Sequence, residues 1–431
     1  MADINQYKKM KEKKSNVVSG SFGHGQNQAK APSVKAVNTS VSNHYEEEDT
    51  QDYYKKIRMH RIKVGIVAAI VVAAVLAFVI YFVMNADNQT YSGYSIISSV
   101  TKEDSTTSNY IDFQGGYIRY SGDGISYYSA KGISVWNQTF QMKSPQLKIC
   151  QECVAIGDIN GSSIYIFNKN GKIGSVDTSM SISQIEVASQ GVVAAVLEDT
   201  NANYINLYGT DGKKIYSVKT TLAGDGYPLD ISISEDASKL VASYVYVSGE
   251  SIKTNVVFYN FSDVGQNETE RLVGGFNHYE STIVPEVQFM SGDYAVAVGE
   301  DVLSIYKIKE YPSLFKEIKI DSEIERVFTS GTYVGMILDN KESGDNYKLV
   351  VYNLSGNQVC ETTFNTTYDN IKFDGNSIIM NNGSVFTLMN LSGKELAHQE
   401  FDLPINQVLS MGSRGDYLLV NSKYVQEIKL N

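Results

Sequence analysis

The chain has 431 residues, of which 42% are hydrophobic, and its formal net charge is −11 at pH 7. Residues 1–63 carry 12 Lys and Arg against 7 Asp and Glu, which leaves 25 against 41 for the remainder. The acidic remainder argues against binding of nucleic acid or anionic lipid through its own surface, and it is long enough to bury a core.

The first sixty residues have the composition of a solvated tail. Residues 1–60 are rich in Lys, Ser, Asn, Gln and Gly and lack clusters of aliphatic side chains. Such a segment cannot bury enough apolar surface to offset the entropy of ordering. We therefore expect a disordered tail, whose basic charge suits the anionic inner leaflet of a membrane.

An apolar run follows the tail. Val64–Met84 contains no charged residue, and at about 1.5 Å per helical residue it spans roughly 31 Å. It is longer than the apolar region of a signal peptide and begins too far along the chain to be one. We predict a transmembrane helix with a basic flank over residues 61–86.

The flanks of the apolar run predict its orientation. The basic residues that precede it are Lys55, Lys56, Arg58, Arg61 and Lys63, whereas Asn85, Ala86 and Asp87 follow it. The positive-inside rule then places the N-terminus in the cytoplasm and residues 87–431 outside. The expected location is the cell membrane, with one crossing.

Small residues recur within the predicted membrane helix. Gly65, Ala69, Ala73 and Ala77 lie four positions apart and therefore share one helix face. This stripe would allow a second helix to approach closely, which makes self-association of the anchor a possibility. Alanine is also common in membrane helices without such a role.

From Tyr94 the apolar residues alternate with a period of two, which is typical of strands. Runs such as IYIFN, VVAAV, INLYG and LVVYN illustrate the pattern. No segment of twelve residues carries a helical stripe with caps. The predicted class is all-β.

A repeat predicts the architecture. A strand, a turn built on Gly with a nearby Lys, Asp or Asn, and another strand recur along the chain, and two further strands precede each copy. The unit is four strands in roughly 35 to 50 residues, which is the repeat length of β-propeller blades. Seven complete units lie between Asn109 and Phe401.

The two ends of the domain hold unmatched strands. Three strands follow the seventh unit, at 406–412, 417–421 and 424–430, and one strand at 94–100 follows the anchor. Pairing of the first strand with the last would complete an eighth blade and hide two sheet edges. We predict eight blades, with seven as the alternative.

These units resemble the repeats of quinoprotein-like and outer-membrane-assembly-type β-propellers, which run strand, Asp-x-x-Gly-Lys turn, strand with Trp. The segment ISYYSAKGISVWNQTF (125–140) comes closest, with Lys131-Gly132 and Trp136 in place. The layout of tail, anchor and propeller also resembles functionally unassigned membrane-anchored propellers of Gram-positive bacteria. The resemblance implies an extracytoplasmic propeller over residues 87–431.

Signatures of catalysis are lacking. The chain contains no G-x-S-x-G, H-E-x-x-H or P-loop pattern, and it offers no matched tryptophan for a quinone cofactor. We expect no catalytic residue, no cofactor and no metal site. A glycosidase needs only two carboxylates, so an enzyme that acts on envelope glycans is the alternative.

Two cysteines have the spacing of a redox motif. Cys150-Gln-Glu-Cys153 joins two apolar runs at an expected hairpin turn, and no helix follows it, which disfavours a redox role. A disulfide across the turn and two unpaired thiols are equally compatible with the sequence. With Cys360, three cysteines are too few for a disulfide framework.

Long connections gather on one predicted face. In a propeller the loops between second and third strands and those between blades share a face, and four long segments belong to it: Thr221–Tyr227, Val247–Thr254, Phe276–Pro285 and Asp339–Asn346. Only Ser262–Glu270 is long on the other face. Length without strand character favours a binding role.

The long loops supply the candidate binding residues, which combine aromatic and acidic groups able to receive a cationic or polar partner. These residues are Asp225, Tyr227, His278, Tyr279, Glu280, Glu342 and Asp345. Tolerated insertion on a solvated surface explains the same loops equally well.

The sequence favours a non-enzymatic, membrane-anchored propeller that binds a protein or a wall polymer in the cell envelope. An extensive propeller surface and the lack of catalytic signatures support this hypothesis. A glycan-acting envelope enzyme and a sensor that signals through the anchor to the tail are the alternatives.

Overall fold

The computed structural model describes residues 46–431, except 87, 103–107, 280 and 341–343. It contains one long helix, α2 (Glu46–Ala86), and a domain of strands from Tyr94 to Leu430. Residues 1–45 of the expected tail lie outside the described residues. The helix and the strand domain are described separately below.

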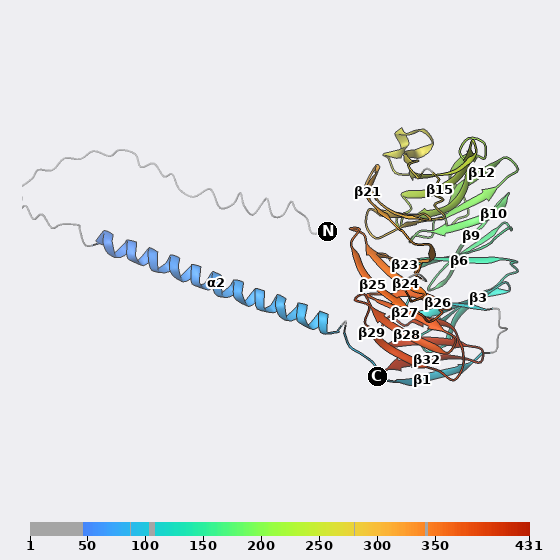
Figure 1. Ribbon diagram of the computed structural model, residues 1–431. Helices are drawn as coiled ribbons and strands as arrows, with labels where there is room; N and C mark the ends of the chain where they lie inside the picture. The colour runs from blue at the N-terminus through green and yellow to red at the C-terminus, as the bar shows by residue number, and fades with distance from the viewer. Residues whose placement is uncertain (1–45, 87, 103–107, 280, 341–343) are drawn as a thin grey trace, which may run out of the picture. The chain divides into compact units, whose positions relative to one another are not determined.

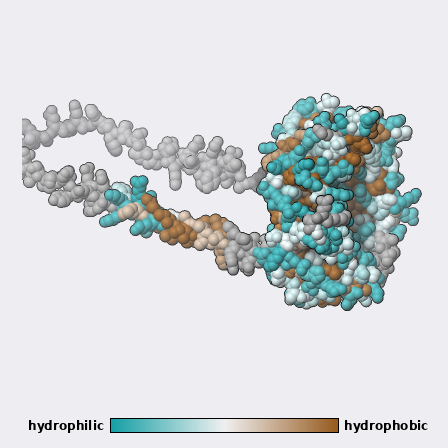
Figure 2. Space-filling view, in the orientation of Figure 1, coloured by the Kyte–Doolittle hydropathy of each residue, from teal (hydrophilic) through white to brown (hydrophobic). Residues whose placement is uncertain are grey.

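The helix α2 is apolar over a length that can cross a membrane. Residues Tyr53–Val79 form the one described helix that meets this criterion of length and composition. Its aliphatic side chains are exposed on every side, including Ile66, Val67 and Ile70, and Figure 2 shows them as a brown band. A helix that is hydrophobic all round requires apolar surroundings.

The helix begins earlier than the sequence indicated. It starts at Glu46, whereas residues 46–60 were assigned to the disordered tail and the helix to residues 61–86. The segment 46–60 contains no Gly or Pro, and Glu, Gln, Lys, Arg and Met are good helix formers. Once the apolar segment is helical, each added residue extends an existing helix without a new nucleation step.

The strand domain contains eight antiparallel sheets of four strands each, which confirms the eight-bladed propeller and excludes seven blades (Figure 1). We number blades 1–7 from the first sheet after β1. Blades 1–4 are formed by β2 (Asn109–Phe113), β3 (Gly116–Ser121), β4 (Gly124–Ser129), β5 (Ser134–Thr139); β6 (Pro145–Cys150), β7 (Cys153–Asp158), β8 (Ser163–Asn168), β9 (Gly171–Asp177); β10 (Ser181–Val187), β11 (Val193–Glu198), β12 (Ala202–Tyr208), β13 (Lys214–Thr221); β14 (Tyr227–Ile233), β15 (Lys239–Ser248), β16 (Ser251–Asn260) and β17 (Leu272–Phe276). Blades 5–7 are formed by β18 (Glu286–Phe289), β19 (Tyr294–Val298), β20 (Val302–Ile308), β21 (Pro312–Lys319); β22 (Ile324–Thr329), β23 (Tyr333–Asp339), β24 (Tyr347–Asn353), β25 (Gln358–Phe364); β26 (Asn370–Asp374), β27 (Ser377–Asn382), β28 (Val385–Asn390) and β29 (Glu395–Glu400).

The eighth blade joins the two ends of the domain, as predicted. Its strands are β30 (Ile405–Ser410), β31 (Asp416–Asn421), β32 (Tyr424–Leu430) and β1 (Tyr94–Thr101). The register of β1 and β32 runs from Tyr94 opposite Leu430 to Thr101 opposite Tyr424. The two strands lie side by side in Figure 1 although they come from opposite ends of the domain.

The core lies between the blades. The second strands are buried almost throughout, as in β11, where Val193, Ala194, Ala195, Val196 and Leu197 are all 0% exposed. Both faces of each sheet pack against neighbouring blades, so these strands read as continuous apolar runs. The outer strands β9 and β21 are mostly exposed or half-buried.

The repeated turn has a shared geometry. In blade 7, the Asn390 side-chain oxygen accepts backbone hydrogen bonds from Ser392 and Lys394, both at 3.0 Å. Gly393 adopts φ +78°, a left-handed conformation that side chains disfavour. In blade 6, Asn353 and Gly356 form the same arrangement. The glycine and the Asx acceptor therefore explain the sequence repeat.

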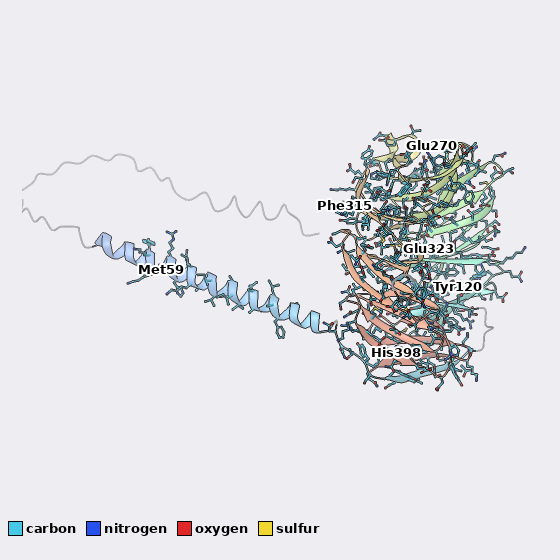
Figure 3. All side chains as sticks on the ribbon, in the orientation of Figure 1. Met59, Tyr120, Glu270, Phe315, Glu323 and His398 are labelled. Carbon is cyan, nitrogen blue, oxygen red and sulfur yellow. The ribbon has the colours of Figure 1, made fainter. Side chains whose placement is uncertain are left out.

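The connections define two faces of the propeller. We call the face that carries the links between successive blades, and the turns between second and third strands, the crossover face. The opposite face, with the remaining two sets of turns, is the hairpin face. The long β16–β17 connection belongs to the hairpin face; it contains η1 (Gly265–Asn267) and η2 (Thr269–Arg271), and Figure 3 labels Glu270 within it.

The segment that precedes β1 is fixed to the hairpin face. The Ser92 and Gly93 backbone N–H groups donate to the Asn431 carbonyl at 2.9 and 3.1 Å, and the Tyr91 N–H donates to the Leu396 carbonyl at 2.7 Å. The Lys394 ammonium group donates to the Asn88 carbonyl at 3.1 Å. The chain therefore enters the propeller beside blades 7 and 8.

Removal of β1 should destabilise the whole propeller. A chain that begins at Thr101 lacks the β1–β32 ladder and the Tyr94 ring, which packs on Phe401 with centroids 4.4 Å apart. We expect a denaturation midpoint clearly below that of a chain that begins at Asp87, because the β32 edge and the apolar core of blade 8 become exposed. Equal midpoints in urea unfolding would show that closure by β1 contributes nothing.

Candidate functional site

The predicted binding residues lie in separate loops of the crossover face. In the β13–β14 loop, one Asp225 carboxylate oxygen accepts from the Thr221 N–H at 2.8 Å and from its hydroxyl at 3.1 Å. The Tyr227 hydroxyl donates to Glu198 of blade 3 at 2.6 Å. Burial, followed by Glu198, raises the pKa of Tyr227 to about 12. Both residues therefore fix the conformation of the chain where it enters blade 4.

The second loop buries one of its candidates. Tyr279 is 4% exposed, and its hydroxyl hydrogen-bonds that of Tyr306 in blade 5. His278 stacks on Tyr279 with centroids 4.4 Å apart, and its Nε2 lies 2.8 Å from Glu317. Burial raises the pKa of Tyr279 to about 12. Tyr279 is therefore a core residue rather than a surface for a partner.

The third loop holds Asp345 by local bonds. Its carboxylate accepts from the Thr363 hydroxyl and from the Asn365 amide, the latter at 2.6 Å. The remaining candidates, Glu280 and Glu342, lie outside the described residues. The described candidates thus bond to other residues of the propeller, which favours the structural explanation of these side chains.

The segment Val247–Thr254 is not a loop. β15 and β16 remain paired to Ser248 opposite Ser251, with a turn at Gly249 and Glu250. The long connection expected from the sequence is therefore a β-hairpin, because Tyr, Val and Ile at 244–247 and 252 favour strands. This hairpin extends beyond the other strands of blade 4.

The projecting part of this hairpin has two unpaired edges. β14 pairs with β15 only up to Tyr227 opposite Val245, and β17 pairs with β16 only up to Phe276 opposite Val256. Among the described strands none continues the sheet beside residues 246–255, which we call the ribbon. Free backbone groups at such edges are able to pair with another chain.

The ribbon tip is apolar and exposed. Val247 is 76% exposed and its cross-strand partner Ile252 is 49% exposed. Leu222, in the adjoining loop, is 45% exposed. A docked partner would remove these side chains from water.

The base of the ribbon is rigidly held. The buried Ser243 hydroxyl donates to the Val284 carbonyl at 2.6 Å, and the Val284 N–H donates to the Thr254 hydroxyl at 3.3 Å. Two buried hydrogen bonds to the β17–β18 loop thus hold the base of the ribbon in place. A preorganised edge loses less entropy when it binds.

The described connections of the crossover face carry a large excess of acid. Their basic side chains are Lys102, Lys143 and Lys423. Their exposed carboxylates are Asp123, Asp199, Asp225, Glu250, Glu300, Asp301, Asp321, Glu323, Asp369 and Asp402. The surface around the ribbon therefore favours cationic partners.

The inner strands are joined around the central channel by polar side chains. The Gln184 amide donates to the Leu229 carbonyl at 2.6 Å, Asp230 accepts from the Val287 N–H at 2.8 Å, and Gln407 accepts from the Tyr110 N–H at 2.7 Å. Each side chain reaches the inner strand of the next blade. The free edges of the inner strands are thereby hydrogen-bonded.

One sector of the channel concentrates charge. Lys148 and Glu186 form a partly buried ion pair, with Asp230 and Glu286 nearby. Burial raises the pKa of Asp230 to about 6 and raises the pKa values of Glu186 and Glu286. Burial alone would lower the pKa of Lys148, but the carboxylates, Glu186 foremost, raise it. No group of three metal-ligating side chains occurs among the residues described.

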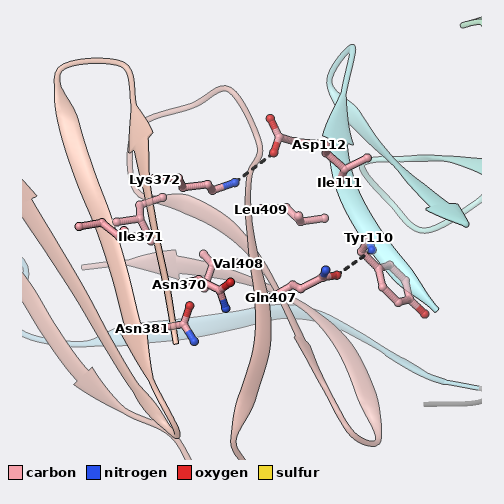
Figure 4. A pocket seen from close by; sticks show the side chains of 11 residues that line it. Tyr110, Ile111, Asp112, Asn370, Ile371, Lys372, Asn381, Gln407, Val408 and Leu409 are labelled. Atoms are coloured by element: carbon pink, nitrogen blue, oxygen red, sulfur yellow. Dashed lines mark hydrogen bonds and ion pairs between the residues drawn. The ribbon is translucent and has the colours of Figure 1, made fainter. Parts of the chain in front are cut away.

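A second sector of the channel contains a pocket of about 270 Å³ between blades 7, 8 and 1 (Figure 4). Lys372 of blade 7 and Asp112 of blade 1 form an ion pair across it at 3.1 Å. Asn370, Asn381 and Gln407 supply amide groups, and Ile371, Val408 and Leu409 supply apolar surface. The ion pair bridges over blade 8 and thus supports the closure of the ring.

The cysteines are free thiols. Cys150 and Cys153 lie opposite each other across the two-residue β6–β7 turn. Burial raises the pKa of Cys150 to about 11 and also raises the pKa of Cys153. Thiolates are therefore scarce at neutral pH, which does not favour a redox role.

Sequence reasoning missed the ribbon and the channel. The ribbon was detectable in principle, since strand-forming residues continue to Val247 and resume at Ser251 around a single Gly-Glu turn. The channel residues carry no local signal, because they come from inner strands in different blades.

Comparisons with known proteins match the fold but give no established activity. A family model described as a family of unknown function, DUF5711, matches residues 87–430. No curated protein matches the sequence at a significant level.

Solved structures with propeller folds resemble the chain. BamB from Moraxella catarrhalis has 11% identity and a TM-score of 0.51, with 78% of this chain and all of that chain covered. Citrobacter koseri AztD has 9% identity and a TM-score of 0.49, with 69% and 87% covered. The WD40 domain of Neurospora crassa Pan2 has 11% identity and a TM-score of 0.41, with 66% and 88% covered. The expected resemblance to outer-membrane-assembly-type propellers is confirmed as a likeness of fold.

The raised pKa of Asp230 predicts a stabilising substitution. The folded-state pKa of about 6 exceeds the usual 3.8, so stability is lost as the pH rises from about 4 to 6. Asp230→Asn keeps an acceptor for the Val287 N–H and removes the charge. We expect it to stabilise the protein by about 1–3 kcal/mol at pH 8, and by much less near pH 4.

Urea unfolding of the full chain in detergent micelles at several pH values measures this difference. Asp402→Asn, at an exposed carboxylate of the β29–β30 loop, should change little at any pH. Destabilisation by Asp230→Asn at pH 8 would contradict the expected penalty of the buried charge.

Proposed function

We propose that this chain, which belongs to the DUF5711 family of unknown function, is a membrane-anchored propeller that binds an extended segment of a protein partner in the cell envelope. The ribbon of blade 4 is the observation that carries the proposal. It combines two unpaired edges with an exposed apolar tip.

The mode of binding follows from the backbone. An extended peptide that pairs with residues 246–248 of β15, or with residues 251–253 of β16, would add a strand to the blade. Main-chain hydrogen bonds would supply affinity, while Val247, Ile252 and Leu222 would receive apolar side chains of the partner. Long exposed edges otherwise favour aggregation, so an unblocked one supports a binding role.

Electrostatics narrows the choice of partner. The crossover loops around the ribbon are acidic, so a cationic segment of the partner would be attracted and nucleic acid repelled. A protein with basic residues beside a strand-forming apolar stretch fits this surface better than an anionic wall polymer.

As a membrane anchor, α2 would hold this binding surface in the cell envelope. The span Tyr53–Val79 is long and apolar enough to cross a membrane, and the basic residues precede it. The positive-inside rule supports a cytoplasmic N-terminus and an extracytoplasmic propeller. Pairing of anchors through Gly65, Ala69, Ala73 and Ala77 is compatible with this arrangement, because all four are exposed on α2.

A second candidate function rests on the carboxylates of the channel. Asp230 and Glu286 both have raised pKa values, which is a property of acids that protonate leaving groups. Against this, Asp230 already caps the inner strand of blade 5. Hydrolysis of wall glycans by the full chain that is abolished by Asp230→Asn or Glu286→Gln would establish this alternative.

Photocrosslinking tests the ribbon. A benzophenone amino acid in place of Val247 in the full chain, expressed in its own cells, should form an adduct with a defined protein. The same probe at Asn376, an exposed turn residue of the hairpin face, is the control position. Ile252→Asp should abolish the Val247 adduct, because it places a charge in the apolar contact.

The Ile252→Asp variant should retain the thermal stability of the parent, since the ribbon tip lies outside the packed blade. An adduct that persists in this variant, or that forms equally from position 376, would refute ribbon-mediated binding.

The proposed topology is tested with epitope tags. A tag after Asn431 should be accessible to antibody on intact spheroplasts, whereas a tag before Met1 should require permeabilisation. Lys and Arg before the span motivate this outcome. The reverse pattern would exclude every envelope function proposed above.

A further inference from the structure

The charges of the propeller are unevenly distributed between its two faces. The crossover loops carry the excess of carboxylates, whereas the turns between third and fourth strands in blades 1–3 carry lysine. The exposed lysines of these turns and of the first two residues of the strands that follow them are Lys131, Lys169, Lys172, Lys213 and Lys214. One carboxylate accompanies them, Asp211, at 2.9 Å from Lys213.

Exposed aliphatic side chains accompany these lysines. Ile133 and Val135 in blade 1 are 64% and 54% exposed, Ile173 in blade 2 is 37% exposed and Ile215 in blade 3 is 58% exposed. Each lies at the start of an outer strand, at the edge of the hairpin face. The same edge of blade 8 carries Ile96 and Ile97, at 53% and 57%.

These turns form one continuous edge. A Cβ built on Gly132 would lie 3.2 Å from the Val100 side chain of β1. The Trp136 indole N–H of blade 1 donates to the Lys169 carbonyl of blade 2 at 3.1 Å. A Cβ on Gly212 of blade 3 would lie 2.7 Å from the Ser175 carbonyl oxygen of blade 2. We call the turns and outer-strand starts of blades 8, 1, 2 and 3 the basic rim.

The basic rim adjoins the point where the chain enters the propeller. Asn88, Tyr91, Ser92 and Gly93 are bonded to blade 7 and to the C-terminus on the hairpin face. α2 ends at Ala86, so one residue separates it from Asn88. Consecutive Cα atoms are about 3.8 Å apart, and this tether therefore reaches less than about 10 Å.

We propose that the basic rim rests on the anionic phospholipid headgroups of the membrane that holds α2, with the crossover face directed away. Lysine ammonium groups would pair with lipid phosphates, and the isoleucine side chains would enter the interfacial layer. The acidic crossover face would be repelled by the same surface. Net charge alone suggested no contact with anionic lipid; the lysines gathered on the basic rim reverse that expectation for the rim alone.

This inference rests on the membrane anchoring in the proposed function, but not on the ribbon. A short tether and an attractive rim together would restrict the tilt of the propeller. The ribbon would then be presented to partners at a fixed height above the membrane.

The single tryptophan of the chain provides the test. Trp136 lies in β5 of the basic rim, so energy transfer from it to dansyl-labelled lipid headgroups reports the distance of the rim from the membrane. The full chain is reconstituted in nanodiscs of phosphatidylglycerol and phosphatidylcholine. Co-elution with the nanodisc shows separately whether α2 inserts.

A matched variant moves the donor to the opposite face. Trp136→Phe combined with Val247→Trp retains an aromatic ring against Phe167, on which Trp136 stacks with centroids 5.0 Å apart. We expect strong transfer from position 136 and a severalfold weaker transfer from position 247. Equal transfer from the two positions in nanodisc-inserted protein would overturn the proposal.

Charge-reversing substitutions of the rim lysines show whether attraction to lipid, rather than the short connection to α2 alone, holds the rim near the membrane. Lys131→Glu, Lys172→Glu and Lys214→Glu together should reduce the transfer from Trp136 in anionic nanodiscs, and high salt should do the same to the parent. The control pair Lys143→Glu and Lys423→Glu, on the crossover face, should leave the energy transfer from Trp136 unchanged. Transfer that is insensitive to the rim substitutions, with thermal stability retained, would show that the rim lysines do not contact lipid.

Discussion

Ring closure is the constraint on which the structure depends. Each sheet is apolar on two faces, and each face is covered only when a neighbouring blade is present on that side. The first and last blades would each leave one face open in a linear array. The pairing of β1 with β32 removes this exposure by building blade 8 from both ends of the domain. The continuous burial of strands such as β11 is possible only in this closed arrangement.

Closure also requires similar side chains at every interface between blades, whereas the residues at the ends of the strands are free to differ from blade to blade. Val, Ile, Ala and Leu recur in the core because the interfaces between blades have the same geometry. The ends of the strands do not face other blades, so they can differ. The crossover face carries the exposed carboxylates and the projecting ribbon. The hairpin face carries the lysine-bearing turns and contacts the segment that precedes β1. Two chemically different surfaces thus coexist on one regular framework.

Much of this organisation was predictable from the sequence because it has a local period. Alternation identified the strands, turns built on Gly with a nearby Lys, Asp or Asn identified the repeat, and unmatched strands at the two ends identified the closure. The candidate site was less predictable. Tyr279 looked like a loop aromatic, but it pairs with Tyr306 in the core, a contact across 27 residues that no local pattern encodes. Asp225 stabilises its own loop and Asp345 binds the end of β25 and the residue after it, so acidic character did not distinguish recognition from structural roles.

The position of β1 also affects how the protein is made. β1 follows α2 and therefore leaves the ribosome first among the strands, whereas its partner β32 is completed last, next to the C-terminal residue Asn431. Synthesis at roughly 5–20 residues per second separates the two events by many seconds. During that interval the ring is open and β1 has no strand to pair with. Closure of the ring therefore waits until β32 has been made, and a product truncated before β32 would carry an open blade that exposes apolar surface to proteases.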